Sequence, residues 1–187
     1  MDHHVDIDLR PDPEFAAHQL MSALYAKLHR ALVRLNCNNI GVSFPGHNDE
    51  APHLGNRMRL HGSQEALAAL MRNDWLTGMR DHVVMGLPSR VPEAAAHCAV
   101  RRVQAKSSPE RLRRRQMRRH GISAEEAQQR VPDGAAKTLR LPFVHLGSSS
   151  TGQSFRLFIV HVPVQEPAAG GVFGAYGLSQ TATVPWF

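Results

Sequence analysis

The feature that most constrains this chain is a block of positive charge between residues 101 and 120. That block holds nine basic side chains and one acid, Glu110, whereas the rest of the chain holds 13 bases and 15 acids. A segment of net charge +8 cannot lie in an apolar core, because ionised side chains are almost never buried without partners. The chain must therefore fold as a mildly acidic body that displays one cationic surface element.

The chemistry of this block indicates a polyanionic partner. Of the 22 basic residues in the chain, 19 are arginine and three are lysine. The planar guanidinium group can bind phosphate or guanine through two hydrogen bonds at once, whereas general solubility would be served equally well by lysine. Most charge runs are solvated helix faces, and that is the alternative here. The near absence of acids favours a polyanion, with nucleic acid preferred over a membrane surface.

The first half of the chain shows alternating strand and helix periodicities. Val5, Ile7 and Leu9 alternate with polar residues, which is typical of a strand that is half buried. The patterns that follow predict a helix over 14–35, strands over 40–44 and 57–61, a helix capped by Ser63 that runs to Met71, and a strand over 82–85. The order βαββαβ predicts a ferredoxin-like domain over residues 1–90, with an antiparallel sheet and two helices on one face.

The second half, residues 91–187, is predicted to be a separate RNA-binding α+β region, so the fold class of the whole chain is α+β. Its centre is an arginine-rich helix at about 108–120, which begins after a serine cap with Pro109 in its first turn and ends at Gly121. Ser123 and Glu126 open another helix through a capping box. Extended segments are predicted at 98–105, 142–146, 154–160 and 172–178.

The arginine helix presents its charge on one face. At about 100° per residue, five arginines fall within an arc of about 140°; they are Arg111, Arg114, Arg115, Arg118 and Arg119. Leu112 and Met117 are the only apolar residues that could attach this helix to the body. Such a helix could enter the major groove of DNA or contact RNA, and charge alone does not distinguish the two.

Several classes of protein are disfavoured by the sequence. No apolar run approaches the length of about 20 residues that a membrane span needs, and residues 1–10 lack the pattern of a signal peptide. The two cysteines, Cys37 and Cys98, are too few for a disulfide scaffold or a cysteine-based zinc site. The twelve histidines follow no metal-binding spacing, and Asp6 and Asp8 are expected on a solvated strand face. We expect a cytoplasmic protein with no metal and no cofactor.

Three features are candidates for chemistry. His29 lies at the edge of the apolar face of its helix, where an imidazole is partly shielded and can exchange protons near neutral pH, although an ordinary boundary histidine would occupy the same position. The hydroxyl-rich segment 147–152 leads into a strand with Phe155, which fits either phosphate and base contacts or a polar turn. The glycine-rich segment 170–177 precedes no helix and is therefore not a dinucleotide-binding motif.

Taken together, these residues resemble the CRISPR-associated repeat-processing endoribonuclease family of subtype I-F. The resemblance covers essentially the whole chain. It rests on the opening Met-Asp-His and on the segments 10–13 (Arg-Pro-Asp-Pro), 27–29 (Lys-Leu-His), 103–107 (Val-Gln-Ala-Lys-Ser), 109–115 (Pro-Glu-Arg-Leu-Arg-Arg-Arg), 150–153 (Ser-Thr-Gly-Gln) and 184–187 (Val-Pro-Trp-Phe).

The resemblance implies a role for each matching residue. His29 would activate the ribose 2′-hydroxyl or assist the leaving oxygen, Ser148 would position that hydroxyl, and Tyr176 would orient His29. Arg102 and Gln104 would read bases near the cut, which agrees with the hydrogen-bonding geometry of arginine with guanine and of glutamine with adenine. The remaining contacts would come from Arg114, Arg115, Arg118, Arg119 and His120 in the groove of the hairpin, from Phe155 under its terminal base pair, and from Ser150 and Thr151 on phosphate.

The family resemblance also implies an activity and partners. The expected activity is cleavage of CRISPR precursor RNA at the base of the repeat hairpin without a metal, after which the mature guide RNA stays bound. The expected partners are the repeat stem-loop RNA and the other subunits of a subtype I-F surveillance complex, with no membrane and no small-molecule cofactor. The alternatives are a subunit that caps a guide RNA without cutting it, and a regulator that binds DNA.

Overall fold

The computed structural model describes residues 1–104, 109–132, 139–147, 152–165 and 169–187. The contacts between residues divide the chain into two compact units. The first unit comprises residues 1–103 and 141–187, and the second comprises residues 104–140.

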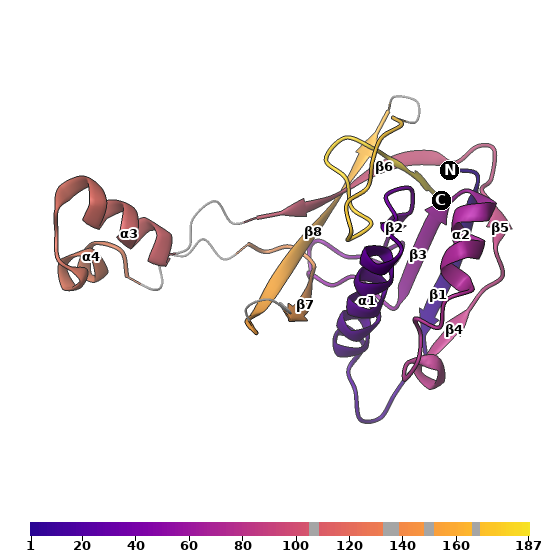
Figure 1. The fold of residues 1–187 in the computed structure, drawn as a ribbon, viewed down its shortest axis with the longest axis horizontal. Helices are drawn as coiled ribbons and strands as arrows, with labels where there is room; N and C mark the ends of the chain where they lie inside the picture. Colours follow the sequence, from indigo (N-terminus) through magenta and orange to yellow (C-terminus); the bar gives the residue numbers. More distant parts are fainter. Residues whose placement is uncertain (105–108, 133–138, 148–151, 166–168) are drawn as a thin grey trace. The chain divides into compact units, whose positions relative to one another are not determined.

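The first unit contains an antiparallel sheet built from the N-terminal part of the chain (Figure 1). Its strand order is β2 (Gly41–Ser43), β3 (Arg57–Gly62), β1 (His3–Leu9) and β4 (Val83–Met85), and β5 (Ser89–Arg90) also pairs with β1. Along β1 every second residue is buried, so that Val5, Ile7 and Leu9 face one side and Asp6 and Asp8 face the other. The alternation predicted from the sequence is therefore confirmed.

Two helices cover one face of this sheet (Figure 1). Helix α1 (Ala17–Arg34) and helix α2 (Gln64–Met71) both pack against β1, and a short 3₁₀ turn, η1 (Arg80–His82), leads into β4. The predicted cap of α2 is present, because the Ser63 side chain accepts a hydrogen bond from the amide of Ala66. The buried side of α1 is the apolar stripe that the sequence predicts; it consists of Leu20, Met21, Leu24, Leu28, Ala31 and Leu32, with Ser22 and Tyr25.

A second antiparallel sheet completes the first unit. Its strand order is β7 (Phe143–Gly147), β8 (Ser154–Val164), β6 (Ala96–Val103) and β9 (Val184–Trp186). Strand β7 packs against α1, so that the two sheets contribute to one continuous apolar core. The edge strand β9 contains Pro185, which agrees with the confinement of proline to sheet edges.

The prediction of a strand over residues 172–178 is wrong. Residues 174–178 form a turn, in which the amide of Gly177 donates to Gly174 O and the amide of Gly174 donates to Leu178 O. Gly177 has a φ of +68°, a conformation that side-chain-bearing residues rarely adopt. The buried residues Phe173 and Leu178 flank the turn and produce an apolar pattern that resembles a strand.

The second unit consists of two short helices. Helix α3 (Pro109–His120) and helix α4 (Ala124–Arg130) pack against each other around Ala127, which is fully buried. The predicted capping box of α4 is present between Ser123 and Glu126. Arg113 Nε donates to Val131 O at 2.8 Å, which ties the middle of α3 to the end of α4.

The predicted α+β class is confirmed, and the first half has the predicted element order βαββαβ. The five-stranded sheet lies within residues 3–90 and the four-stranded sheet within 96–186, whereas the compact units separate residues 104–140 from everything else. A division into domains at about residue 90 stays a prediction. In the part of the chain that the structure describes, no helix is both long enough and apolar enough to cross a membrane.

Candidate active site and nucleic-acid interface

His29 lies in the last third of α1, at the border between its buried and exposed sides. Its ring is half-buried, and Nδ1 is 2.8 Å from the carbonyl oxygen of Ala175. A carbonyl oxygen only accepts hydrogen bonds, so Nδ1 must carry the proton in this contact. The lone pair of the neutral ring is then on Nε2, and this contact therefore selects the tautomer that could act as a base through Nε2.

The ring of Tyr176 lies against the imidazole of His29. The two ring centroids are 4.0 Å apart and the planes differ by 12°, which is a stacked arrangement. The turn at 174–178 thus provides two contacts to His29, one from the backbone at Ala175 and one from the neighbouring side chain. Both contacts come from a segment about 145 residues away in the chain, and together they restrict the orientation of the imidazole.

Arg102 and Phe155 lie near this cluster. Arg102 is in β6 and Phe155 is in β8, and the two strands are neighbours in the second sheet. The guanidinium carbon of Arg102 is 5.8 Å from the centre of the Phe155 ring and 5.7 Å from the centre of the Tyr176 ring. The structure therefore brings together four of the predicted site residues: His29, Tyr176, Arg102 and Phe155.

Other predicted site residues are not part of this group. Ser148, Ser150 and Thr151 lie outside the described residues. Gln104 is exposed and falls in the second compact unit, whereas Arg102, two residues earlier, falls in the first.

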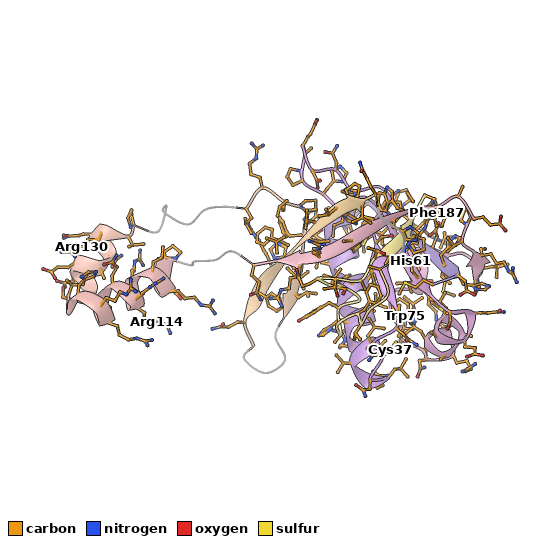
Figure 2. All side chains as sticks on the ribbon, turned by 90° about the horizontal axis from the view of Figure 1, so that it is seen from above. Cys37, His61, Trp75, Arg114, Arg130 and Phe187 are labelled. Carbon is orange, nitrogen blue, oxygen red and sulfur yellow. The ribbon has the colours of Figure 1, made fainter. Side chains whose placement is uncertain are left out.

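The predicted cationic face lies on α3 in the second unit (Figure 2). Arg111, Arg114, Arg115, Arg118 and Arg119 are exposed and line a surface groove of about 450 Å³. His120 is the last residue of α3 and is also exposed. Leu112 is half-buried and Met117 is exposed, so the apolar contribution of α3 is as small as the sequence predicts. The arrangement gathers five guanidinium groups around one groove, and each of them is a group that can bind phosphate through two hydrogen bonds.

The carboxylates Asp6 and Asp8 correct one expectation from the sequence. They were expected on a solvated strand face, but Asp6 forms two hydrogen bonds with Arg59, at 2.6 and 2.8 Å, and Asp8 forms two with Arg57. Burial opposes ionisation of Asp6, but the hydrogen bond and charge of Arg59 outweigh it and lower the pKa of Asp6. Because β1 and β3 are paired in register, each aspartate lies directly across from its arginine.

His61 and His161, which are not among the predicted site residues, are buried. His61 contacts the hydroxyl of Ser43 at 2.8 Å, and His161 Nε2 accepts a hydrogen bond from the amide of Phe44 at 3.2 Å. Burial lowers the pKa of each to about 3, with a further contribution from Arg59 at His61 and from His47 at His161. Within the described residues, no three His, Cys, Asp or Glu side chains are grouped so that they could hold a metal ion.

Comparison with known proteins identifies the family. The family model described as "CRISPR-associated protein (Cas_Csy4)" matches residues 4–187. The chain belongs to this family. One relative, "CRISPR-associated endonuclease Cas6/Csy4" from Pseudomonas aeruginosa (strain UCBPP-PA14), is 56% identical over 187 residues, which cover the full length of both chains. A protein of the same name from Escherichia coli (strain UTI89 / UPEC) is 43% identical, also over the full length of both.

Membership in the Cas_Csy4 family confirms the resemblance drawn from the sequence motifs. Two parts of the His29 environment were not predicted. The carbonyl of Ala175 is a backbone group, and no residue type encodes it. The hydroxyl of Tyr25, which is 2.7 Å from Tyr176 O, does leave a signal, because Tyr25 is the one phenol in the apolar stripe of α1 and lies one helical turn before His29.

Proposed function

We propose that this protein is a metal-independent endoribonuclease that cleaves CRISPR precursor RNA at the base of each repeat hairpin. The observation that carries the proposal is the environment of His29, whose tautomer and orientation are fixed by Ala175 O and Tyr176 at the edge of the buried core. The names of the two relatives, both CRISPR-associated endonucleases, support the same activity.

The proposed reaction is an internal transesterification of RNA. Nε2 of His29 takes the proton of a ribose 2′-hydroxyl, and the 2′-oxygen attacks the adjacent phosphorus. The bond from phosphorus to the 5′-oxygen of the next nucleotide breaks, and that oxygen takes a proton from water as it leaves, while the imidazolium returns its proton to the solvent. The products are a 2′,3′-cyclic phosphate and a 5′-hydroxyl end. A well-placed base contributes on the order of 10²–10⁴ to the rate of such a step.

The other predicted residues have supporting roles in this proposal. Ser148 positions the 2′-hydroxyl, and Ser150 and Thr151 bind phosphate near the cut. Arg102 and Gln104 read the base edges above the cut, and Phe155 stacks under the terminal base pair. The guanidinium carbon of Arg102 lies 5.8 and 5.7 Å from the centres of the Phe155 and Tyr176 rings, respectively, which supports a shared role for these three side chains at the base of the stem.

The arginines of α3 are proposed to bind the hairpin, together with His120, the last residue of that helix. The major groove of long A-form RNA is too narrow to admit a helix, but it widens at the ends of a short stem, so a stem-loop fits this mode better than a long duplex. If about five phosphates are contacted, binding should weaken with salt with a log–log slope of roughly −4. Strong retention of the stem would keep the mature guide RNA bound after cleavage.

The proposed setting of the reaction is a subtype I-F surveillance complex in the cytoplasm, in which the protein holds the hairpin end of the guide RNA. This setting rests on the family and on the nature of the substrate.

The test is a cleavage assay in EDTA with a repeat-hairpin RNA, run beside the same RNA with a 2′-deoxy nucleotide at the cut site. We expect cleavage of the first RNA alone, with a product that carries a cyclic phosphate. Binding of both RNAs without cleavage would indicate a guide-RNA cap instead. Preferential binding of duplex DNA would indicate a DNA-binding regulator.

A further inference from the structure

Tyr25 is a polar residue inside the apolar face of α1. Its side chain is fully buried, and its hydroxyl donates to Tyr176 O at 2.7 Å. Burial raises the pKa of Tyr25 well above its usual range, so that the phenol keeps the proton that it donates. The rings of Tyr25 and Tyr176 are also nearly parallel, with centroids 6.5 Å apart and planes that differ by 5°.

The turn at 174–178 receives donors at three consecutive carbonyls. Ala175 O accepts from His29 Nδ1 at 2.8 Å, Tyr176 O accepts from the Tyr25 hydroxyl at 2.7 Å, and Gly177 O accepts from the amide of Val42 at 2.9 Å. The first two donors lie on α1 and the third lies in β2. The peptide that presents its oxygen to His29 is therefore fixed on its C-terminal side by two hydrogen bonds that do not involve His29.

We propose that Tyr25 is a positioning residue for His29, because its hydroxyl fixes the turn that supplies both the carbonyl acceptor of Nδ1 and the ring on which the imidazole stacks. The inference rests on the proposed function and goes beyond it by assigning a role to a residue that does not touch the substrate.

The geometry explains why this contact matters more than an ordinary buried hydrogen bond. Tyr25 and His29 are four residues apart, so they lie one turn apart on the same face of α1. The helix, the Tyr25 hydroxyl, the backbone at 175–176 and the imidazole form a closed loop of contacts. Without the hydroxyl, the loop opens, Ala175 O can move away from Nδ1, and the Nε2–H tautomer, which cannot accept a proton at Nε2, becomes available.

The test compares Tyr25→Phe, which removes only the hydroxyl, with Ser22→Ala as the matched control. Ser22 is one turn earlier on α1 and is also buried; its hydroxyl donates to His18 O and accepts from the amide of His145. Both variants lose one buried hydroxyl of α1, and both are expected to lower the melting temperature by about 2–4 °C. Only Tyr25→Phe is expected to disturb His29.

Two measurements separate positioning from stability. The first is the ¹⁵N NMR spectrum of the imidazoles in the free protein, in which the Nδ1–H tautomer of His29 should dominate in wild type and in Ser22→Ala and should give way to a mixture in Tyr25→Phe. The second is single-turnover cleavage of the repeat hairpin at saturating protein. Its rate should fall on the order of tenfold in Tyr25→Phe, with binding of the 2′-deoxy hairpin changed less than twofold.

A second variant perturbs the same turn at Gly177, where the backbone packs against Val42. A Cβ on Gly177 would lie 2.4 Å from Val42 Cγ2, and the residue has a φ of +68°, so Gly177→Ala should displace the turn and produce the same change of tautomer. The inference is overturned if Tyr25→Phe and Gly177→Ala both keep the Nδ1–H tautomer and lose no more rate than Ser22→Ala. Should wild type fail to cleave, the proposed function fails, whereas the NMR comparison still decides the role of Tyr25.

Discussion

The two candidate sites of this protein use polar residues in opposite ways. In the first unit, His29 is half-buried and has a backbone acceptor at 2.8 Å and a stacked ring at 4.0 Å. In the second unit, the arginines of the cationic face of α3 are exposed, on a helix with no fully buried residue. The first arrangement restricts the orientation of the His29 imidazole, whereas the second concentrates positive charge on one face of a helix.

This difference has a physical reason. Proton transfer to a ribose hydroxyl requires the base at hydrogen-bonding distance and in the correct tautomer, so the base must be fixed by surrounding structure. Attraction to a polyphosphate depends on the number and density of charges and tolerates flexible side chains. We therefore expect changes at His29 and at the contacts that fix its imidazole to act on the rate of cleavage, and changes on α3 to act on binding.

The largest expected effect concerns binding. Replacement of Arg114, Arg115, Arg118 and Arg119 by Gln keeps a polar side chain with a similar helix preference but shortens it and removes four charges. At about 1 kcal/mol or more per charged contact, affinity for the repeat hairpin should fall by at least about 10³-fold. The slope of log affinity against log salt concentration should become less negative by about 3. Titration of the labelled hairpin at several salt concentrations measures both.

The control for this variant is Arg130→Gln, an exposed arginine at the end of α4 in the same unit. Its affinity should stay within a few-fold of wild type. The expectation that α3 acts on binding would be contradicted if the quadruple variant cleaved much more slowly than wild type even when the hairpin is fully bound.

The next effect is a loss of stability in mild acid, caused by His61 and His161. Both have a pKa of about 3 when folded and about 6.5 when unfolded, so the unfolded chain binds more protons between these values. The contribution of the two neutral histidines to the free energy of unfolding is complete above about pH 6.5 and is lost as the pH falls toward 3. From pH 7.5 to 5.0 the free energy of unfolding should fall by about 2 kcal/mol per histidine, measured by urea unfolding.

A variant sharpens this prediction. Between pH 7.5 and 5.0, the free energy of unfolding of His61→Gln should fall by only about half as much as that of wild type, whatever the stability of the variant at pH 7.5. An unchanged loss would mean that His61 is not responsible.

A smaller effect distinguishes buried from exposed charge within one sheet. The Arg59 side chain is 7% exposed, and besides Asp6 it contacts Phe187 O at 2.7 Å. The Arg57 side chain, the partner of Asp8, is 42% exposed. Asp6→Asn should therefore lower the free energy of unfolding by about 3 kcal/mol, because it leaves a buried guanidinium without its carboxylate, and Asp8→Asn by less than about 1 kcal/mol. Urea unfolding at pH 7.5 measures both, and equal losses would contradict the role of burial.

The regular elements could be predicted because their periodicities reflect burial on one face. The alternation in β1 and the apolar stripe of α1 are examples, and the caps of α2 and α4 were visible in Ser63 and Ser123. The segment 172–178 was predicted as a strand because its spacing of apolar residues says nothing about the sign of φ at Gly177. Strand β9 was missed because its three residues are too few to show a period.

The candidate site was predictable only in part. The boundary position of His29 and the motifs around it pointed to the residue, and charge density pointed to α3. The contact between His29 and Ala175 O depends on a long-range turn and on a backbone atom, neither of which has a local sequence pattern. The arrangement of Tyr25, Tyr176 and His29 likewise arises only when the turn at 174–178 packs on α1.

The central claim is that the imidazole of His29 performs the proton transfer while other parts of the protein bind the RNA. The most direct measurement compares His29→Ala with wild type, using single-turnover cleavage of the repeat hairpin at saturating protein and, in parallel, the affinity for the 2′-deoxy hairpin. We predict that the rate falls by at least about 10²-fold while the affinity changes less than about threefold. Cleavage at the wild-type rate, or equal losses of cleavage and affinity, would contradict the account.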